Sequence, residues 1–212
     1  ERLLEEASKV EISEDTMKSS AVRSGYYDLS ILNTSMPLSV VEKMAEKAKE
    51  RRTPLRILAY GAGSGTGKSA FAYHLAEILG LKLMVRRPSD IILKYIGESE
   101  AAVSSAFREA EITHSILLFD EAESYLAKKI DGTSSGSRSY NDLTNCFLVE
   151  MERFSGIMIC TTHHNEFLES SFIRRFHRAI EFKYPKATGI RKLFSSYFHD
   201  IHFREKDIDM IC

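Results

Sequence analysis

A glycine-rich segment between an apolar run and a helical pattern constrains the fold of this chain more than any other feature. Residues 55–60 read LRILAY, a compact apolar run typical of a buried strand, and residues 67–79 follow with helical spacing of apolar side chains. Between them residues 61–69 read GAGSGTGKS. A strand, a glycine-rich turn and a helix N-terminus in this order predict a phosphate-binding loop, because glycines let backbone N–H groups converge on a phosphate.

The register of this loop has two interpretations. Counting back from Lys68 through the variable positions of the motif places the first loop residue at Ala62, whereas the alternative starts at Gly61 and makes the loop one residue longer. We favour Ala62, because the phosphate cradle has a fixed ring size. Lys68 would bring positive charge to the β- and γ-phosphates, and Ser69 would place a hydroxyl on Mg²⁺. The predicted nucleotide-binding residues are Ala62, Gly63, Ser64, Gly65, Thr66, Gly67, Lys68, Ser69 and Ala70.

Strands and helices alternate along the chain. Apolar runs predict strands at 55–60, 81–86, 114–120, 156–162 and 179–184. Helical spacing predicts helices at 38–52, 67–79, 99–111, 140–153 and 170–176. This alternation predicts an α/β fold, a three-layer αβα sandwich around a five-stranded parallel sheet. Ser39 is the predicted N-cap of the first helix, with Glu42 completing a capping box.

An acidic pair follows the apolar run at 114–120. Residues 115–124 read SILLFDEAES, so Asp120 and Glu121 stand where a strand of a parallel sheet ends. Asp120 is the predicted Mg²⁺ partner, acting through water, together with Ser69. Glu121 is the predicted general base that orients the attacking water.

Composition limits the classes of partner. The formal net charge of −1 gives no overall attraction to nucleic acid or to an anionic membrane. The three cysteines, Cys146, Cys160 and Cys212, form no CxxC pair, which indicates a reducing compartment and hence a cytoplasmic protein. No apolar run approaches the ~20 residues that cross a bilayer, so we expect no membrane segment.

Together these motifs resemble the AAA+ ATPases, and most of all the bacterial AAA branch related to sporulation and cell-division ATPases. AGSGTGKSAFA resembles their Walker A loop, and ILLFDEAES resembles Walker B with its acidic pair. The resemblance implies ATP and Mg²⁺ as cofactors and a homo-oligomeric, hexameric ring with ATP at each subunit interface. It also implies three regions: a linker at 1–26, the nucleotide-binding core at 27–186, and the beginning of a helical lid at 187–212.

Three further segments carry the resemblance. YDLSILN at 27–33 resembles the segment near the adenine, which makes Asp28 and Leu29 candidate nucleotide contacts. LKYIGESE at 93–100 resembles the first pore loop, whose aromatic-hydrophobic pair, here Tyr95 and Ile96, grips a substrate polypeptide. The alternative for Tyr95 is a core position.

The third segment, FLESSFIRRF at 167–176, resembles the region that carries arginine fingers. Arg174 and Arg175 would then reach the γ-phosphate held by a neighbouring subunit. The alternative is two surface arginines near a helix end. The serine- and glycine-rich stretch 131–140 is predicted to be a mobile loop, either a second pore loop in which Arg138 touches substrate or a plain loop.

The chain departs from the family pattern at two places. Ala62 replaces the usual glycine, and Gly63 and Ser64 stand where the family often has prolines, which predicts a more mobile empty loop. At the sensor position, where the family usually has Thr-Asn, this chain has His163, which could still donate a hydrogen bond. The alternative is that Asn165 or a backbone group serves instead.

The predicted function is Mg-dependent ATP hydrolysis that remodels or unfolds an unknown protein substrate through a hexameric pore. One alternative is a nucleotide-dependent switch or scaffold with weak turnover, which the departures at Ala62 and His163 favour and Glu121 disfavours. A second is a nucleic-acid-associated motor on the same core, which would need a basic face or an added binding element.

Overall fold

The computed structural model describes residues 28–61, 63–95, 97–126, 135–164, 168 and 170–197. Their strands form one six-stranded sheet in the order β1-β6-β2-β5-β4-β3. The strands are β1 (Asn33–Thr34), β2 (Leu55–Tyr60), β3 (Leu83–Arg86), β4 (Ile116–Phe119), β5 (Ile157–Thr162) and β6 (Arg178–Lys183). The five predicted strands are confirmed and pair in parallel. β1 was not predicted; it pairs antiparallel with β6 at the edge of the sheet.

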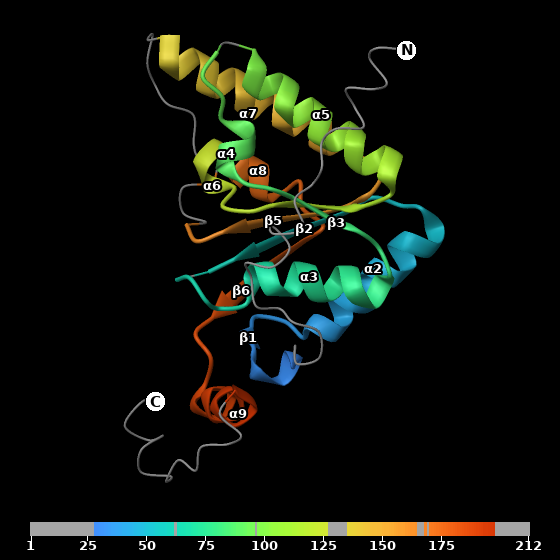
Figure 1. Cartoon of the computed structure of the whole chain (residues 1–212), viewed down its shortest axis with the longest axis vertical. Helices are drawn as coiled ribbons and strands as arrows, with labels where there is room; N and C mark the ends of the chain where they lie inside the picture. Colours follow the sequence, from blue (N-terminus) through green and yellow to red (C-terminus); the bar gives the residue numbers. More distant parts are fainter. Residues whose placement is uncertain are drawn as a thin grey trace.

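Helices cover both faces of the sheet (Figure 1). α2 (Leu38–Arg51) and α3 (Lys68–Leu79) lie on one face, and α5 (Glu98–Thr113) and α7 (Ser135–Arg153) lie on the other. The shorter helices are η2 (Leu29–Ile31), α4 (Pro88–Ile91), α6 (Glu123–Leu126), α8 (Ser170–Ile173) and α9 (Ala187–Tyr197). The predicted three-layer sandwich is therefore confirmed.

Two apolar cores separate the layers, and alternate residues of β2, β3, β4 and β5 contribute to different cores. In β4, Leu117 and Phe119 pack with α5 and α7, whereas Ile116 and Leu118 pack with α2 and α3. The ring of Phe119 contacts that of Phe147 of α7 edge-on, with 4.7 Å between centroids. Because both faces of the sheet are covered, the strands read as continuous apolar runs rather than alternating ones.

Two local predictions are wrong. α2 begins one residue earlier than its predicted cap, with Pro37 as the N-cap and no side-chain cap hydrogen bond, so Ser39 lies inside the helix. α7 begins at Ser135, so the second half of the stretch predicted as a loop, including Arg138, is helical. The sequence did not predict this start because serine and glycine have weak helix propensity.

α9 packs on η2 beside the sheet. A Cβ on Gly189 of α9 would lie 2.6 Å from the carbonyl oxygen of Ile31, so the two helices meet backbone to backbone. The rest of the predicted lid, after Tyr197, lies outside the described residues, as does the linker 1–26.

Gly61 is the glycine that made the start of the loop ambiguous. It follows β2 with φ = +138°, and a Cβ there would lie 2.1 Å from the carbonyl oxygen of Phe182 in β6. Gly61 is therefore required by the approach of two strands, whatever the loop binds.

We predict that Gly61→Ala lowers the free energy of unfolding by about 2–4 kcal/mol, because it adds an overlap with β6 to the strain of a positive φ. The matched control is Gly80→Ala at the end of α3, where φ is also positive but no atom lies within 4 Å of the added Cβ. This control should lose only about 1 kcal/mol. Denaturant unfolding measures both; equal losses would contradict the assignment of Gly61 to strand packing.

Candidate nucleotide-binding site

The loop between β2 and α3 has the backbone of a phosphate cradle. Gly63, Gly65 and Gly67 adopt positive φ angles of 81°, 81° and 95°, respectively. Gly67 is the N-cap of α3 without a side-chain cap hydrogen bond, so the first N–H groups of the helix face the loop. The helix dipole makes this end attractive to an anion. Ala62, the predicted first residue of the loop, and Ile96 of the predicted pore pair lie outside the described residues.

Lys68 closes this loop on itself. Its side chain is buried, and Nζ donates to the carbonyl oxygens of Gly61 at 3.2 Å and Gly63 at 2.9 Å, and to Thr66 Oγ1 at 3.2 Å. Burial lowers the pKa of Lys68, while the carboxylates of Glu123 and, second, Asp120 oppose that shift. The ammonium thus lies where an anion would find a partly desolvated positive charge.

Asp120 joins three elements at the carboxyl edge of the sheet. It follows β4, and its Oδ1 accepts from Ser69 Oγ of α3 at 2.8 Å. The same oxygen accepts from Thr161 Oγ1 of β5. Hydroxyl and carboxylate oxygens are the ligands that Mg²⁺ prefers, so these side chains fit the ion predicted here. Among the described residues no group of three or more His, Cys, Asp or Glu could hold a metal ion.

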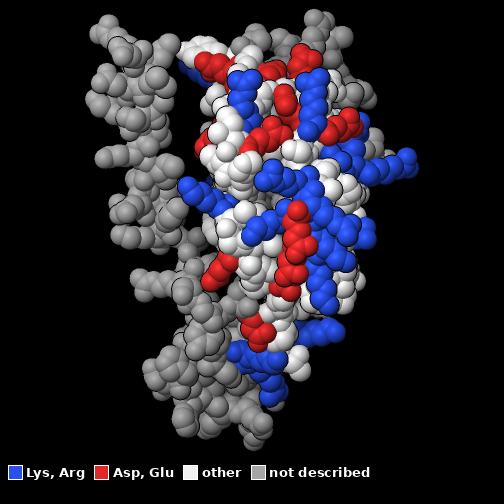
Figure 2. Space-filling model, turned by 90° about the vertical axis from the view of Figure 1, so that its right-hand side faces the viewer, with Lys and Arg blue, Asp and Glu red and all other residues white. Residues whose placement is uncertain are grey.

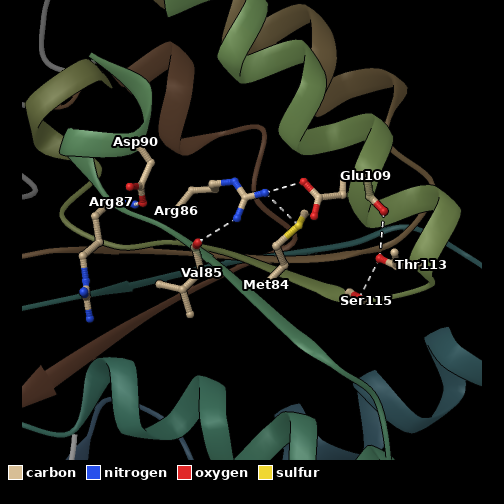
Figure 3. Close-up of polar contacts among 8 residues, drawn as sticks. All are labelled: Met84, Val85, Arg86, Arg87, Asp90, Glu109, Thr113 and Ser115. Atoms are coloured by element: carbon tan, nitrogen blue, oxygen red, sulfur yellow. Dashed lines mark hydrogen bonds and ion pairs between the residues drawn. The ribbon is translucent and has the colours of Figure 1, made fainter. Parts of the chain in front are cut away.

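The edge strand β3 supports Asp120 from its other side. The Asp120 N–H donates to the carbonyl oxygen of Arg86 at 2.9 Å. The Arg86 guanidinium in turn donates to Glu109 of α5 at 2.5 Å, which ties β3 to the helix above it (Figure 3). After the strand, the Arg87 N–H donates to Asp90 at 2.8 Å and begins α4.

Glu121 lies beside Asp120 with a backbone that L-residues rarely adopt. Its φ is +56°, its side chain is exposed, and its N–H donates to Thr161 Oγ1 at 3.2 Å. Non-glycine residues at positive φ carry strain and are concentrated at functional sites. Glu121 thus lies, with an exposed side chain, next to Asp120 at the carboxyl edge of the sheet.

His163 and Glu123 add a second link between the strands and the loop. The His163 N–H donates to Glu123 Oε1 at 3.2 Å, and His163 Nδ1 donates to the carbonyl oxygen of Gly63 at 3.1 Å. The buried Glu123 Oε2 has no hydrogen-bond partner among the described residues. Glu123 was not predicted as a site residue, although the third acid in the sequence DEAE marks its position. The alternative sensor, Asn165, lies outside the described residues.

The predicted arginine fingers are not brought to the loop of their own chain. Arg175 lies two residues before His177, whose N–H donates to the carbonyl oxygen of Arg56 at the start of β2. Arg174 and Arg175 therefore lie toward the amino edge of the sheet. Arg175 Nε donates to Glu152 of α7 at 2.6 Å, and Arg174 is exposed. The sheet therefore lies between these arginines and the phosphate loop.

Basic side chains gather along this amino edge. The face at the right of Figure 1 carries a cluster of lysines and arginines over its middle (Figure 2). The direction of the strands places several arginines at this edge, at the ends of α2 and α7 and at the starts of β2 and β6. They are Arg51, Arg52, Arg56, Arg153 and Arg178. A net charge near zero thus conceals a local basic surface.

Tyr95 lies in the connection between α4 and α5, and its side chain is 65% exposed. The alternative of a core position is therefore wrong. Ile92 and Leu93 are also exposed, at 48% and 43%. Gly97, at φ = +86°, is the N-cap of α5 and ends the connection. An exposed apolar segment of this kind is typical of a surface that contacts another molecule.

The predicted adenine-side residues lie beside a cleft. Asp28 caps η2 by accepting from the Ser30 N–H at 2.8 Å, and the hydrogen bonds from Ser30 lower the pKa of Asp28. The cleft has a volume of ≈ 370 Å³ and is lined by residues 30–37 together with Lys186, Thr188 and Gly189. Asp28 and Leu29 stand immediately before the first lining residue.

The fold and this site define a nucleotide-binding α/β domain of the P-loop NTPase type. Residues 57–184 match the family described as "ATPase family associated with various cellular activities (AAA)". The chain belongs to this family.

Comparisons with individual proteins agree. The chain is 28% identical over 165 residues to the proteasome-activating nucleotidase of Thermococcus gammatolerans, covering 74% of this chain and 41% of that protein. It is 29% identical over 165 residues to the human ATPase family gene 2 protein homolog A, covering 74% of this chain and 18% of that protein. The matched part is thus less than half of either relative.

A solved structure supports the fold. The crystal structure of the FIGL-1 AAA domain in complex with ADP matches with a TM-score of 0.69 and 17% identity, covering 89% of this chain and 66% of that one. These archaeal and other relatives do not support the narrower resemblance to the bacterial sporulation and cell-division branch. Within the described residues, every helix is too short or too polar to cross a membrane.

Proposed function

We propose that this chain binds ATP in the loop at 62–69 and hydrolyses it with the help of Mg²⁺. The observation that carries the proposal is the meeting of Lys68, Ser69 and Asp120 at one edge of the sheet, beside the N-terminus of α3. A cation, a hydroxyl and a carboxylate at a helix N-terminus match the needs of a nucleoside triphosphate with its metal.

The side chains of the site would divide the chemistry among them. The loop N–H groups bind phosphate oxygens, and Lys68 exchanges its loop carbonyls for phosphate. Ser69 and, through water, Asp120 would hold Mg²⁺, which would neutralise phosphate charge. Glu121 orients the attacking water and accepts its proton on the carboxylate. His163 lies beside Gly63, within reach of the same end of the loop.

We propose that copies of this chain assemble into a homo-oligomeric ring, as the family resemblance implies. The basic amino edge, with Arg174 and Arg175, suits contact with the phosphates and carboxylates at a neighbour's nucleotide edge. Arg175 would first have to leave Glu152. Both arginines therefore remain candidates for the residue that stabilises transition-state charge in the next subunit.

The proposed work of this ATPase is the remodelling of a polypeptide. The exposed Tyr95, beside Ile92 and Leu93, offers an apolar grip that needs no particular substrate sequence. The resemblance to proteasome-activating nucleotidases favours this class of substrate. The basic amino edge is the feature that favours the alternative of a nucleic-acid-associated motor.

Two substitutions test nucleotide binding and turnover separately. We predict that Lys68→Ala weakens ATP binding by roughly 100-fold, because it removes the buried cation. Glu121→Gln should keep ATP binding and slow turnover by about 10²–10⁴-fold, because the amide cannot accept the proton. Calorimetry and phosphate release measure the two effects.

The matched controls are Lys82→Ala and Glu46→Gln, which alter exposed side chains away from the loop and should change neither quantity. Unaltered ATP binding in Lys68→Ala would overturn the assignment of the loop. Unaltered turnover in Glu121→Gln would overturn the assignment of the base.

For the substrate class, we predict that Tyr95→Ala keeps basal ATP turnover and abolishes its stimulation by casein, an unstructured polypeptide. Tyr95→Phe should keep the stimulation, because the ring rather than the hydroxyl makes the grip. The readout is phosphate release with and without casein. Stimulation by single-stranded DNA instead of casein would favour the nucleic-acid motor, and equal stimulation of both Tyr95 variants would remove Tyr95 from the grip.

A further inference from the structure

Gly63 is the point where three separate elements contact the phosphate loop. Its carbonyl oxygen accepts from Lys68 Nζ of α3 at 2.9 Å and from His163 Nδ1, after β5, at 3.1 Å. On its other side lies Tyr184, which follows β6: a Cβ on Gly63 would lie 2.4 Å from the Tyr184 hydroxyl oxygen. The phenol therefore rests directly against the backbone of the loop.

Tyr184 is not a core residue. Its side chain is 63% exposed, so burial of the ring does not explain its position. Its backbone is fixed from β1: Asn33 Nδ2 donates to the Tyr184 carbonyl oxygen at 3.0 Å, and Asn33 pairs with Lys183 in the sheet. Asn33 also lines the cleft beside η2. The ring is thus anchored at the end of the sheet and reaches over the first half of the loop.

The first half of the loop, residues 62–64, contains no proline that would fix its backbone. The contacts at Gly63 supply a restraint of another kind. We propose that Tyr184 is a positioning residue that braces the phosphate loop against β6, with His163, after β5, holding Gly63 through its carbonyl oxygen. Gly63 admits the phenol because it has no Cβ, so the glycine and the tyrosine act as a pair.

This proposal rests on the proposed function of the loop as the ATP site. It predicts that Tyr184 affects nucleotide binding and not turnover. Ordering a mobile loop costs about 1–2 kcal/mol per residue, and a loop that is already ordered avoids part of that cost on binding. The brace should therefore strengthen nucleotide binding. It should leave turnover at saturating ATP unchanged, because Tyr184 touches none of the groups proposed to react.

Hydrogen exchange without nucleotide tests the brace directly. Tyr184→Ala should speed amide exchange at residues 63–67 in the nucleotide-free protein, with little change in the protein saturated with Mg-ATP. ATP should bind about tenfold more weakly, and KM should rise without a fall in kcat. Tyr184→Phe keeps the ring and loses only the hydroxyl against Gly63, so it should show a smaller change in the same direction.

Tyr73→Phe is the matched control, because it removes a phenolic oxygen from the middle of α3 and should change neither exchange nor affinity. Unchanged exchange at 63–67 together with unchanged affinity in both Tyr184 variants would overturn the proposal. If Tyr184→Ala unfolds, Tyr184→Phe decides by the same two measurements. This proposal and the assignment of the ATP site can fail separately. If the loop is not the ATP site, the unaltered chain would not bind ATP, or Lys68→Ala would bind ATP normally.

Discussion

The buried ammonium of Lys68 holds the phosphate loop together through its bonds to Gly61, Gly63 and Thr66. Among the described residues no carboxylate forms an ion pair with this buried cation, and the loop carbonyls supply oriented dipoles instead. The positive φ angles of the loop glycines let the backbone curl around this group. Burial lowers the pKa of Lys68, and the carboxylates of Glu123 and Asp120 oppose this shift.

The parallel sheet determines what can meet this cation. Because the carboxyl ends of β2, β4 and β5 share one edge, the loop, Asp120 and His163 are neighbours although about fifty or more residues separate the loop from either of them. Glu123 completes the group, with one oxygen on the His163 N–H and the other buried without a partner in the described part of the chain.

Much of this arrangement could be predicted from local patterns. The apolar runs gave the five parallel strands, because a sheet covered on both faces needs continuous apolar residues. The loop and the acidic pair could be placed because their chemistry demands a strand end beside a helix N-terminus. β1 could not be predicted, since two residues are too few to show a period. The start of α7 was missed because the serines and the glycine of its first turn have weak helix propensity.

Contacts between distant segments were also beyond the sequence. No sequence pattern predicts the contact of Gly61 with Phe182 or of Gly63 with Tyr184. These residues meet only because β2 and β6 are neighbours in the sheet. The exposure of Tyr95, by contrast, agrees with the exposed pore loop that LKYIGESE resembles. Glu123 differs, since it stands in a recognisable acidic motif.

The central claim is that Lys68 exchanges its loop carbonyls for the phosphates of ATP. A crystal structure of this chain with Mg²⁺ and a non-hydrolysable ATP analogue tests it most directly. The expected result is an analogue whose phosphates lie in the loop, with Lys68 Nζ on phosphate oxygens and no longer bonded to both Gly61 and Gly63. An analogue bound elsewhere, with Lys68 still on both carbonyl oxygens, would contradict the claim.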